Sequence, residues 1–360
     1  GWFIKIDEIR PMALKAIEDV EFKPDYAKKR MQDWLQNMGD WNISRSRFYG
    51  LPLPFYVCEK CGKVHVIGSL EELKKRAVDP KLVEKLPNIH RPWIDDIKIK
   101  CDCGEVVSRI PDVGDVWLDA GITPFSTKKY FTDKAFFKNN FPSDYVCEMI
   151  EQIKLWFYSL LIMSVVLTGK APYKKLVTYQ YVRDEHGGEF HKSGGNSLEA
   201  DIVADKVGAD VVRYLFSSSS PGNDMRFGFN LTDEARRKIL AFWNIYTFFN
   251  TYACIDNPDI AHFKPTEQQL TETDKWLVES VNKFISDSDK NYADDKNFLV
   301  VKDFEKLVDD ISNFYIRANR KRFWKSENKT DQLTAYWCLY HAIKSLIRVM
   351  TPIIPFVTEY

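Results

Sequence analysis

The sequence predicts an α/β fold: a half-domain built on a parallel sheet, carrying a small cysteine-bracketed insert and followed by an α-helical bundle. Three observations predict it. Residues 143–217 alternate between strand and helix patterns, two close cysteine pairs bracket residues 58–103, and four long helical patterns follow residue 231. A chain of 360 residues is long enough for about two or three domains with cores of their own.

Charge and hydropathy exclude several classes of protein. The 51 basic and 51 acidic residues cancel, so a polyanion must be met by a local basic patch. The longest apolar run, residues 155–167, is shorter than the roughly 18 residues of a membrane span and suits a buried core helix. We expect no membrane association. The absence of an export signal and the paired cysteines indicate a reducing cytoplasm. The missing initiator methionine suggests a piece of a larger protein.

The first 121 residues combine helices with the insert. Residues 5–37 show helical periodicity that is divided into two helices by a proline. Within the insert, residues 69–79 form a helix that begins at a capping box of Ser69 and Glu72. Residues 110–121 return to an apolar, strand-like pattern.

The next segment contains a strand–helix–strand unit. Residues 144–149 and 175–182 have strand patterns, and an apolar helix over about 150–168 connects them. Such a unit is a right-handed crossover of a parallel sheet, so the carboxyl ends of both strands meet at one edge. Helices are predicted over 198–208 and from near Asp210 onward.

The carboxyl edge of this sheet is the first candidate site. Glu148 ends the first strand, Gln152 follows it, and Lys192 lies in the loop "EFHKSGGNS" (189–197) after the second strand, so the three should converge. Carboxylates there can bind an ammonium group or ribose hydroxyls, and a lysine on a glycine hinge can reach a phosphate chain. The alternatives are a solvated loop, with Glu148 and Glu151 only stabilising a helix N-terminus.

Four cysteines form the second candidate site. They follow the pattern C-x2-C, a gap of 39 residues, then C-x-C. Four thiolates can close a tetrahedral zinc site, so a structural Zn²⁺ is predicted, with His65 and His90 as substitute ligands. The alternative is four unliganded cysteines. The predicted metal ligands are Cys58, Cys61, Cys101 and Cys103.

Two basic segments are candidates for RNA contact. "RANRKRFWK" (317–325) places arginines and lysines beside two aromatic residues, and "SRSRFYG" (44–50) has the same character. The combination suits an RNA backbone and a splayed base. An ordinary solvated surface is the alternative, and it is favoured on these segments alone. The candidate residues are Arg45, Arg47, Arg317, Arg320, Lys321 and Arg322.

Five stretches follow one another in a family-specific order: "DWNISRSRFYGLPLPFY", "HRPWIDDI", "RIPDVGDVWLDAG", "GKAPYKKLVTYQYVRDEHGGEFHKSGGN" and "VDDISNFYIRANRKRFWK". Together they closely resemble the class I aminoacyl-tRNA synthetases of the branched-aliphatic subgroup. The isoleucine branch is the most similar, through "HRPWIDDI" and "DVWLDAG". The resemblance covers essentially the whole chain.

The resemblance implies four segments. Residues 1–50 are a catalytic-domain segment after an editing insertion, and residues 51–112 are a zinc-ribbon-like insert. Residues 113–230 are the second half of a Rossmann-like catalytic domain, and residues 231–360 are an incomplete anticodon-binding bundle. The family's His-Ile-Gly-His motif is absent and the editing domain should lie upstream, so we expect this segment not to aminoacylate alone.

The glycine loop resembles the family's Lys-Met-Ser-Lys-Ser motif. Lys192 falls on the second lysine and Ser193 on the serine after it, while Gly195 and Asn196 match the following glycine and asparagine. The resemblance implies that Lys192 stabilises the ATP pyrophosphate during adenylate formation. The three positions before Lys192 depart from the motif, with Glu189 in place of the first lysine.

The strand end resembles the family's Glu-Gly-Ser-Asp-Gln pattern with a tryptophan four residues later. Glu148, Gln152 and Trp156 match, and Glu151 replaces the aspartate. The resemblance implies that Glu148 and Glu151 hold the adenylate ribose and the ammonium group, with polar contacts from Gln152. Trp117 and Trp156 would wall the apolar side-chain pocket, where shape alone discriminates weakly.

As a whole, the resemblance implies a monomeric, cytoplasmic enzyme that activates isoleucine with ATP and Mg²⁺ and transfers it to tRNA. Catalysis would rest on positioning and charge stabilisation. Valine and leucine enzymes are alternatives, as is a non-catalytic RNA-binding paralogue, which the altered loop suggests. A further alternative is a zinc-ribbon nucleic-acid module in residues 51–112.

Overall fold

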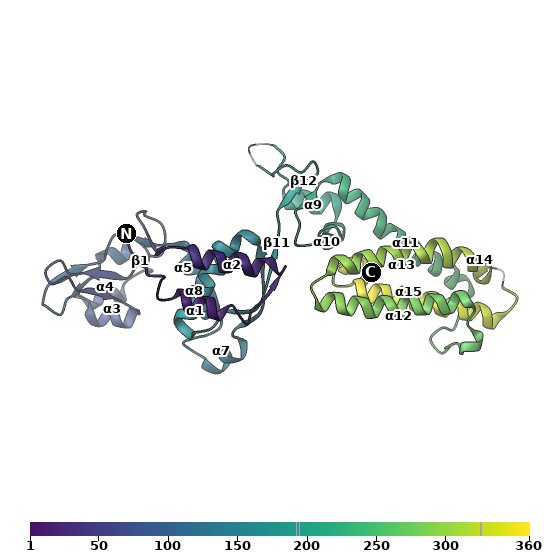
Figure 1. The fold of residues 1–360 in the computed structure, drawn as a ribbon, viewed down its shortest axis with the longest axis horizontal. Coiled ribbons are helices and arrows are strands. Elements are labelled where there is room, and N and C mark those ends of the chain that lie inside the picture. The colour runs from purple at the N-terminus through teal and green to yellow at the C-terminus, as the bar shows by residue number, and fades with distance from the viewer. Residues whose placement is uncertain (192, 194, 325) are drawn as a thin grey trace. The chain divides into compact units, whose positions relative to one another are not determined.

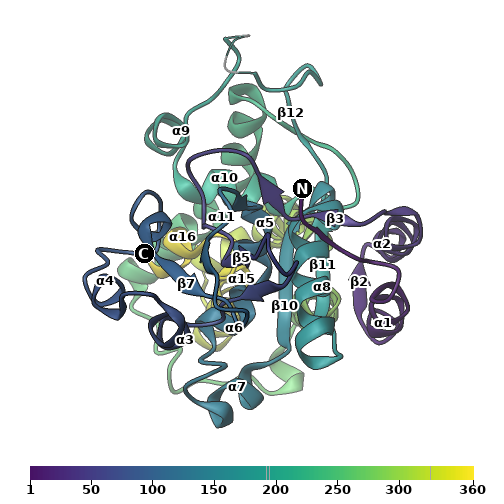
Figure 2. The same ribbon diagram turned by 90° about the vertical axis from the view of Figure 1, so that its left-hand side faces the viewer.

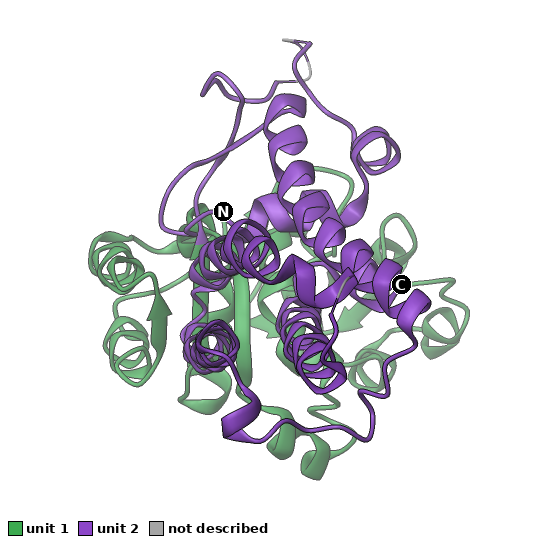
Figure 3. Ribbon diagram, turned by 90° about the vertical axis from the view of Figure 1, so that its right-hand side faces the viewer, with its two compact units in different colours: residues 1–178 green, residues 179–360 purple. Residues whose placement is uncertain are grey.

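The computed structural model describes residues 1–191, 193, 195–324 and 326–360. The chain forms two compact units, residues 1–178 and 179–360, which are green and purple in Figure 3. The cysteine insert belongs to the first unit and the long helices to the second (Figure 1). The division at Thr178 falls inside the segment 113–230 that the sequence assigns to one domain.

A three-stranded sheet lies at the centre of the first unit, in the order β10–β11–β2. β10 is Ser143–Met149 and β11 is Tyr173–Tyr179. The N–H of Ser143 donates to the carbonyl of Pro172 (2.9 Å) where both strands begin, so they run in the same direction. Helix α8 (Trp156–Thr168) connects them. The predicted strand–helix–strand unit is confirmed.

The third strand of this sheet, β2 (Glu21–Lys23), was not predicted. It is parallel to β11, with Phe22 opposite Leu176, and it lies between α1 (Arg10–Ala16) and α2 (Tyr26–Asn37). Figure 2 shows both helices beside it. Three residues are too few for a pattern of alternation, which is why the sequence shows only the two flanking helices.

Helix α8 is the apolar core helix that the sequence predicts. Eight of its residues are buried, from Phe157 to Val165. The stretch Ile150–Thr168 is long and apolar enough to cross a membrane by composition, yet 56% of its most apolar 18-residue window is buried inside the protein. A helix that is apolar on all sides and covered by other elements is a core helix of a folded domain. Its predicted first turn is a separate 3₁₀ helix, η2 (Ile150–Lys154).

The predicted strand over residues 110–121 is wrong for most of its length. Only β9 (Val113–Gly114) is extended, and helix α5 (Val116–Gly121) follows. Asp115 starts this helix, because its carboxylate accepts the N–H of Trp117 (3.3 Å). The other short elements of this unit, outside the insert, are β1 (Phe3–Ile4), β3 (Trp41–Asn42), β4 (Ser44–Arg45), α6 (Thr123–Thr127) and α7 (Lys134–Asn140).

The cysteine insert has a core of its own around Tyr56, Leu73 and Ile99. Its predicted helix begins at Ser69, whose hydroxyl accepts the N–H of Glu72 (3.1 Å). The Glu72 carboxylate in turn binds the preceding N–H, that of Gly68 (2.9 Å). The elements are two antiparallel ribbons, β5 (Phe55–Val57) with β6 (Val64–Val66) and β7 (Lys98–Lys100) with β8 (Val106–Ser108), and the helices α3 (Leu70–Arg76), α4 (Pro80–Glu84) and η1 (Trp93–Asp96).

The second unit begins with two parallel strands, β12 (Val182–Asp184) and β13 (Met225–Phe227). The predicted strand over 175–182 is thus divided: β11 ends at Tyr179, and the chain then pairs with a new partner. The sequence does not reveal this change of partner strand, because strand-forming residues continue through it without a break. Helices α9 (Ala200–Val207) and α10 (Ala209–Ser217) follow as predicted.

All four helical patterns after residue 231 are confirmed as helices that share one core with α9 and α10. The third pattern is not one α-helix, because a π-helical turn, η5 (Ile311–Ile316), interrupts it, and the fourth is broken at residues 351–354. The helices are α11 (Phe229–Asp256), α12 (Glu272–Ala293), α13 (Asn297–Asp310), α14 (Arg317–Trp324), α15 (Lys329–Met350) and α16 (Pro355–Glu359), with a 3₁₀ turn η4 (Glu267–Gln269) before α12.

Candidate functional site

The carboxyl end of β10 carries the predicted carboxylates. Glu148 is half-buried, and its carboxylate accepts the N–H of Met149 (2.8 Å). Glu151 and Gln152 follow in η2 and are also half-buried. The amide oxygen of Gln152 accepts the N–H of Trp156 (3.2 Å), the first residue of α8. Gln152 therefore caps this helix through its oxygen, and its amide NH2 group is the part that a ligand can contact.

The two predicted pocket tryptophans lie on the packed pair α5 and α8. The indole N–H of Trp156 donates to the carbonyl of Ala120 (3.1 Å). Close packing of the helices depends on Gly121, where a Cβ would lie 2.9 Å from the Ser159 carbonyl oxygen. Trp117 lines a cavity of about 450 Å³ with Trp34, Trp41 and Tyr158, among others, and Trp156 does not line it.

A polar clasp closes the base of the glycine loop. The guanidinium of Arg183, in β12, binds the carboxylate of Glu189 (2.7 Å) and that of Asp224 (2.9 Å). The side-chain oxygen of Asn196 accepts the N–H of His191 (2.9 Å), and its NH2 group donates to the Glu189 carbonyl (2.8 Å). We call Arg183, Glu189 and Asn196 the loop clasp. It holds together the two limbs of the loop.

A carboxylate of β12 supports the clasp. Asp184 accepts the side-chain N–H of Asn196 (3.1 Å) and the backbone N–H of Gly188 (2.8 Å). The Gly188 N–H, followed by the Asn196 amide, keeps the pKa of Asp184 below its ordinary range. The carboxylate therefore stays ionised as an acceptor at neutral pH.

Lys192, the predicted catalytic residue, lies outside the described residues. Its neighbour Ser193 is exposed, and Gly195 has a φ of +72°, a conformation that favours glycine. Lys192 follows a strand of the second unit, whereas Glu148 and Gln152 belong to the first. Their convergence stays a prediction.

Reversing the charge of Glu189 should loosen the clasp. Glu189→Lys restores the lysine of the family's motif, yet it places two cations side by side where Arg183 now binds a carboxylate. Exposed ion pairs contribute about 0.2–1 kcal/mol, so amide hydrogen exchange over residues 184–191 should quicken by up to about five-fold. Asp205→Lys, at an exposed carboxylate of α9, is the matched control. Equal exchange in both variants would remove Glu189 from the clasp.

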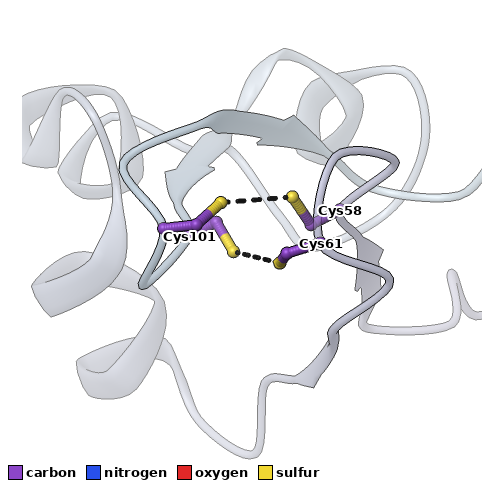
Figure 4. Close-up of side chains that lie close together, drawn as sticks. Cys58, Cys61 and Cys101 are labelled. Atoms are coloured by element: carbon purple, nitrogen blue, oxygen red, sulfur yellow. Dashed lines mark hydrogen bonds between the residues drawn. The ribbon is translucent and has the colours of Figure 1, made fainter.

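The four cysteines gather between the two ribbons of the insert. Their sulfur atoms all lie within 4.8 Å of one another. Cys58 and Cys103 are 3.6 Å apart, as are Cys61 and Cys101 (Figure 4). A tetrahedral zinc ion with bonds of about 2.3 Å would separate its sulfur ligands by about 3.8 Å. The predicted residues therefore fit a zinc ion in both ligand type and spacing.

The four thiols of the cluster differ in their protonation. The backbone N–H of Cys61 lowers the pKa of the Cys58 thiol to about 7. The N–H of Cys103 acts the same way on Cys101, but burial and the neighbouring thiols outweigh it and raise that pKa to about 12. One thiol ionises readily, and a bound cation would displace the remaining protons. His65 is buried, with its Nε2 atom 3.2 Å from the Cys101 sulfur, so it lies beside the four thiols.

The predicted basic stripe separates into two parts. Arg317, Arg320 and Lys321 are exposed on α14. The guanidinium of Arg322 instead points inward: its two terminal nitrogens lie 2.9 Å from the two carboxylate oxygens of Asp274, whose side chain is fully buried. Arg322 therefore supports the fold. Lys325 lies outside the described residues.

The second basic segment separates in the same way. Arg45 binds the buried carboxylate of Asp115 at 2.7 Å, and the indole N–H of Trp41 donates to the same oxygen (3.0 Å). Arg45 thus fastens the loop to the start of α5. Arg47 is exposed, and its carbonyl accepts an N–H of Arg91 (3.4 Å).

Sequence reasoning missed the carboxylates that organise these cations. Asp274 follows Thr271 by three residues, which is the signature of a capping box, and the structure has that box. Asp115 directly precedes an apolar helical turn, which is an N-cap signal. Neither signal shows which distant arginine the carboxylate binds.

Comparisons with known proteins agree with the fold. The family model "tRNA synthetases class I (I, L, M and V)" matches residues 1–228, and "Anticodon-binding domain of tRNA ligase" matches residues 274–360. Isoleucine--tRNA ligase of Dehalococcoides mccartyi is 36% identical over 371 residues, covering 100% of this chain and 36% of the relative. That of Thermus thermophilus is 37% identical over 366 residues, covering 100% and 35%.

Solved structures show the same fold at low identity. Mycobacterium tuberculosis methionyl-tRNA synthetase with methionyl-adenylate superposes with a TM-score of 0.72 at 15% identity, covering 99% of this chain and 61% of that one. An Agrobacterium radiobacter LeuRS–tRNA complex gives a TM-score of 0.64 at 19% identity, covering 89% and 41%. The chain spans about a third of the length of its curated relatives. It belongs to the class I tRNA synthetases, in the group of the isoleucine, leucine, methionine and valine enzymes.

Proposed function

We propose that this chain is part of an isoleucine--tRNA ligase, which activates isoleucine with ATP and Mg²⁺ and transfers it to tRNA. The observation that carries the proposal is the similarity to isoleucine--tRNA ligases along 99–100% of the chain. The activity belongs to the full-length protein, and segment 113–230 supplies half of its catalytic domain. We propose a monomeric enzyme of the cytoplasm.

The end of β10 is the proposed adenylate site. Half-buried Glu148 and Glu151 would bind the ribose hydroxyls and the ammonium group, because a partly desolvated carboxylate attracts both strongly. Gln152 would add a donor from its NH2 group while its oxygen caps α8. Trp117 and Trp156 would wall the isoleucine side chain.

The glycine loop is the proposed pyrophosphate site. Lys192 would place its ammonium on the phosphate chain as negative charge develops, with Ser193 beside it and the ATP-bound Mg²⁺ sharing that charge. Gly195 would permit the turn. Asn196 would act through the loop clasp, because its side chain already binds both limbs of the loop.

Zinc would have a structural role in the insert, where four thiolates leave no open position for a substrate. Arg317, Arg320 and Lys321 are the proposed tRNA contacts, together with Arg47. Arg45 and Arg322 are held in intramolecular ion pairs, and we assign them to the support of these surfaces.

Amino-acid-dependent pyrophosphate exchange by the full-length protein tests the proposal. Exchange should require isoleucine, and Lys192→Ala should lower its rate by about 100-fold or more, the usual cost of removing one group that stabilises developing charge. Lys170→Ala, at an exposed lysine before β11, is the control. Exchange with valine or leucine alone would assign a sister enzyme, and no exchange with any amino acid would favour a non-catalytic RNA-binding paralogue.

A further inference from the structure

An apolar cavity of about 710 Å³ lies beside the base of the glycine loop, within the second unit. Phe190 lines it from the limb before Lys192, and Leu198 lines it from the limb after. Its other walls include Val203 of α9, Val212 of α10 and Phe227 of β13. None of the loop-clasp residues lines it, so the loop has an apolar contact that is separate from the polar one.

The residues around Phe190 alternate between solvent and the cavity. The side chains of Glu189 and His191 are 58% and 63% exposed, whereas Phe190 is half-buried and packs against the core of the second unit. The backbone is extended here, because Glu189 forms a β-bridge with Arg183. Successive side chains of an extended chain point to opposite sides. The polar side of this limb therefore carries the clasp, and the other side carries the Phe190 ring.

The second limb has the same two-sided arrangement. Asn196 belongs to the clasp through its bonds to His191 and to the Glu189 carbonyl. Leu198, two residues later, is half-buried against the same core as Phe190. We call Phe190 and Leu198 the apolar anchor. The loop between them is fastened at its base by polar contacts on one side and apolar contacts on the other.

The lining of the cavity suits an anchor better than a polar ligand. Among the described residues, only Ser197 and Arg213 of this lining are polar. The Arg213 guanidinium already donates to the carbonyls of Ile353 (3.0 Å) and Pro352 (2.6 Å). Such a lining offers few groups that could orient a polar molecule. It does leave room around Phe190, so a ring larger than phenylalanine should fit there, which a tightly packed core would not permit.

We propose that Phe190 and Leu198 are positioning residues, which hold the base of the glycine loop so that Lys192 meets the phosphate chain. The inference rests on the proposed function, because the anchor acts through Lys192. Phe190 lies two residues before that lysine along the chain, so displacement of its ring displaces the backbone that carries the ammonium group. A charged group stabilises developing charge fully only when it is held at the right place, so the rate depends on the anchor.

Isoleucine-dependent pyrophosphate exchange by the full-length protein tests the anchor. Phe190→Ala should lower kcat by about 10-fold and leave the KM for isoleucine within about two-fold, because the loop is displaced while the amino-acid pocket is intact. Phe190→Met and Phe190→Trp should keep kcat within about two-fold of the parent, because each refills the cavity. Phe248→Ala, which removes another half-buried ring from α11, is the control and should exchange as the parent does.

A double variant distinguishes positioning from an independent effect. Phe190→Ala/Lys192→Ala should be within about two-fold of Lys192→Ala alone, because the anchor has no lysine left to position. Losses that multiply in the double variant would overturn the proposal. An equal loss of kcat in Phe248→Ala would also overturn it, in favour of a general loss of packing.

Amide hydrogen exchange of the 360-residue chain gives a readout that needs no substrate. Phe190→Ala and Leu198→Ala should each quicken exchange over residues 188–198 by about five-fold, while α11–α15 stay protected. Unchanged exchange over that segment would show that neither residue anchors the loop. A parent protein that exchanges pyrophosphate with no amino acid would refute the proposed function, and the hydrogen-exchange result would still decide whether the anchor exists.

Discussion

Serine in place of Cys101 should abolish zinc binding by the insert and unfold residues 55–108. Cys58 and Cys101 are both buried within the small core of the insert, beside the metal cluster. A core of this size depends on its metal, and structural zinc contributes about 10–16 kcal/mol of apparent free energy in isolated zinc modules. The bound zinc should fall from about one ion per chain to almost none, measured by mass spectrometry of the native protein.

Amide hydrogen exchange shows where the structure is lost. Protection of residues 55–108 should disappear in Cys101→Ser, while the helices α11–α15 of the second unit keep theirs. Cys254→Ser, at an exposed cysteine of α11, should retain both zinc and protection. A Cys101→Ser protein that keeps its zinc and its protected ribbons would show that the cluster is not the metal site.

Alanine in place of Asp274 should lower the free energy of unfolding of the second unit by about 3–5 kcal/mol, because it leaves the largely buried Arg322 guanidinium without its fully buried carboxylate partner. The side chains of Asp274 and Arg322 are 0% and 13% exposed. Asp274 also accepts the Tyr315 hydroxyl and closes the capping box of α12 with Thr271. Denaturant unfolding followed by circular dichroism measures the change.

Two further variants identify the cause. Asp331→Ala, which removes the more exposed partner of Arg322, should cost about 1 kcal/mol or less. Asp274→Leu/Arg322→Met, which removes both charges, should be more stable than Asp274→Ala. A double variant that is less stable than the single one would assign the cost to lost packing.

Folding at acid pH tests the same pair: burial raises the pKa of Asp274, but Arg322 and Tyr315 outweigh this and keep it below its ordinary value.

Because the pKa of Asp274 is lowered in the folded protein, the second unit should lose stability at acid pH. A carboxyl whose pKa is lower in the folded state than in the unfolded state binds fewer protons when folded. Its contribution is therefore fully present above about pH 4 and is lost as the pH falls through the folded-state pKa. Asp274→Asn should remove this part of the acid sensitivity of the second unit.

Long periodic patterns allowed most of the fold to be predicted from the sequence. The four C-terminal helical patterns are confirmed because each buries one face in a shared core, and the β10–α8–β11 unit because α8 is a long apolar helix between two strand patterns. Short elements escaped: β2 and β13 have three residues each, and α5 begins where Asp115 caps an apolar run that also suits a strand. Whether such a short segment becomes a strand or a helix depends on the distant residues that it pairs with or packs against.

In the candidate sites, too, the features set by local sequence spacing were predicted and those that depend on distant partners were not. Spacing along the chain predicted the cysteine cluster, because C-x2-C and C-x-C turns bring thiols together locally. Spacing could not separate exposed Arg320 from Arg322, which binds a buried carboxylate, since both belong to one basic run. The difference depends on Asp274, 48 residues earlier in the chain. A partner at that separation leaves no local pattern.

The π-helical turn Ile311–Ile316 determines which side chains of the following helix, α14, face the core and which face solvent. It accommodates one residue more than an α-helical turn, and each residue of an α-helix advances by about 100°. α14 is therefore rotated by about that angle from the direction that α13 alone would give it. Deletion of a single residue from the π-helical turn would rotate α14, so that Arg322 would face solvent and another basic side chain would face the core. Which arginine of α14 is exposed to solvent therefore depends on the number of residues in the preceding π-helical turn as well as on the basic run itself.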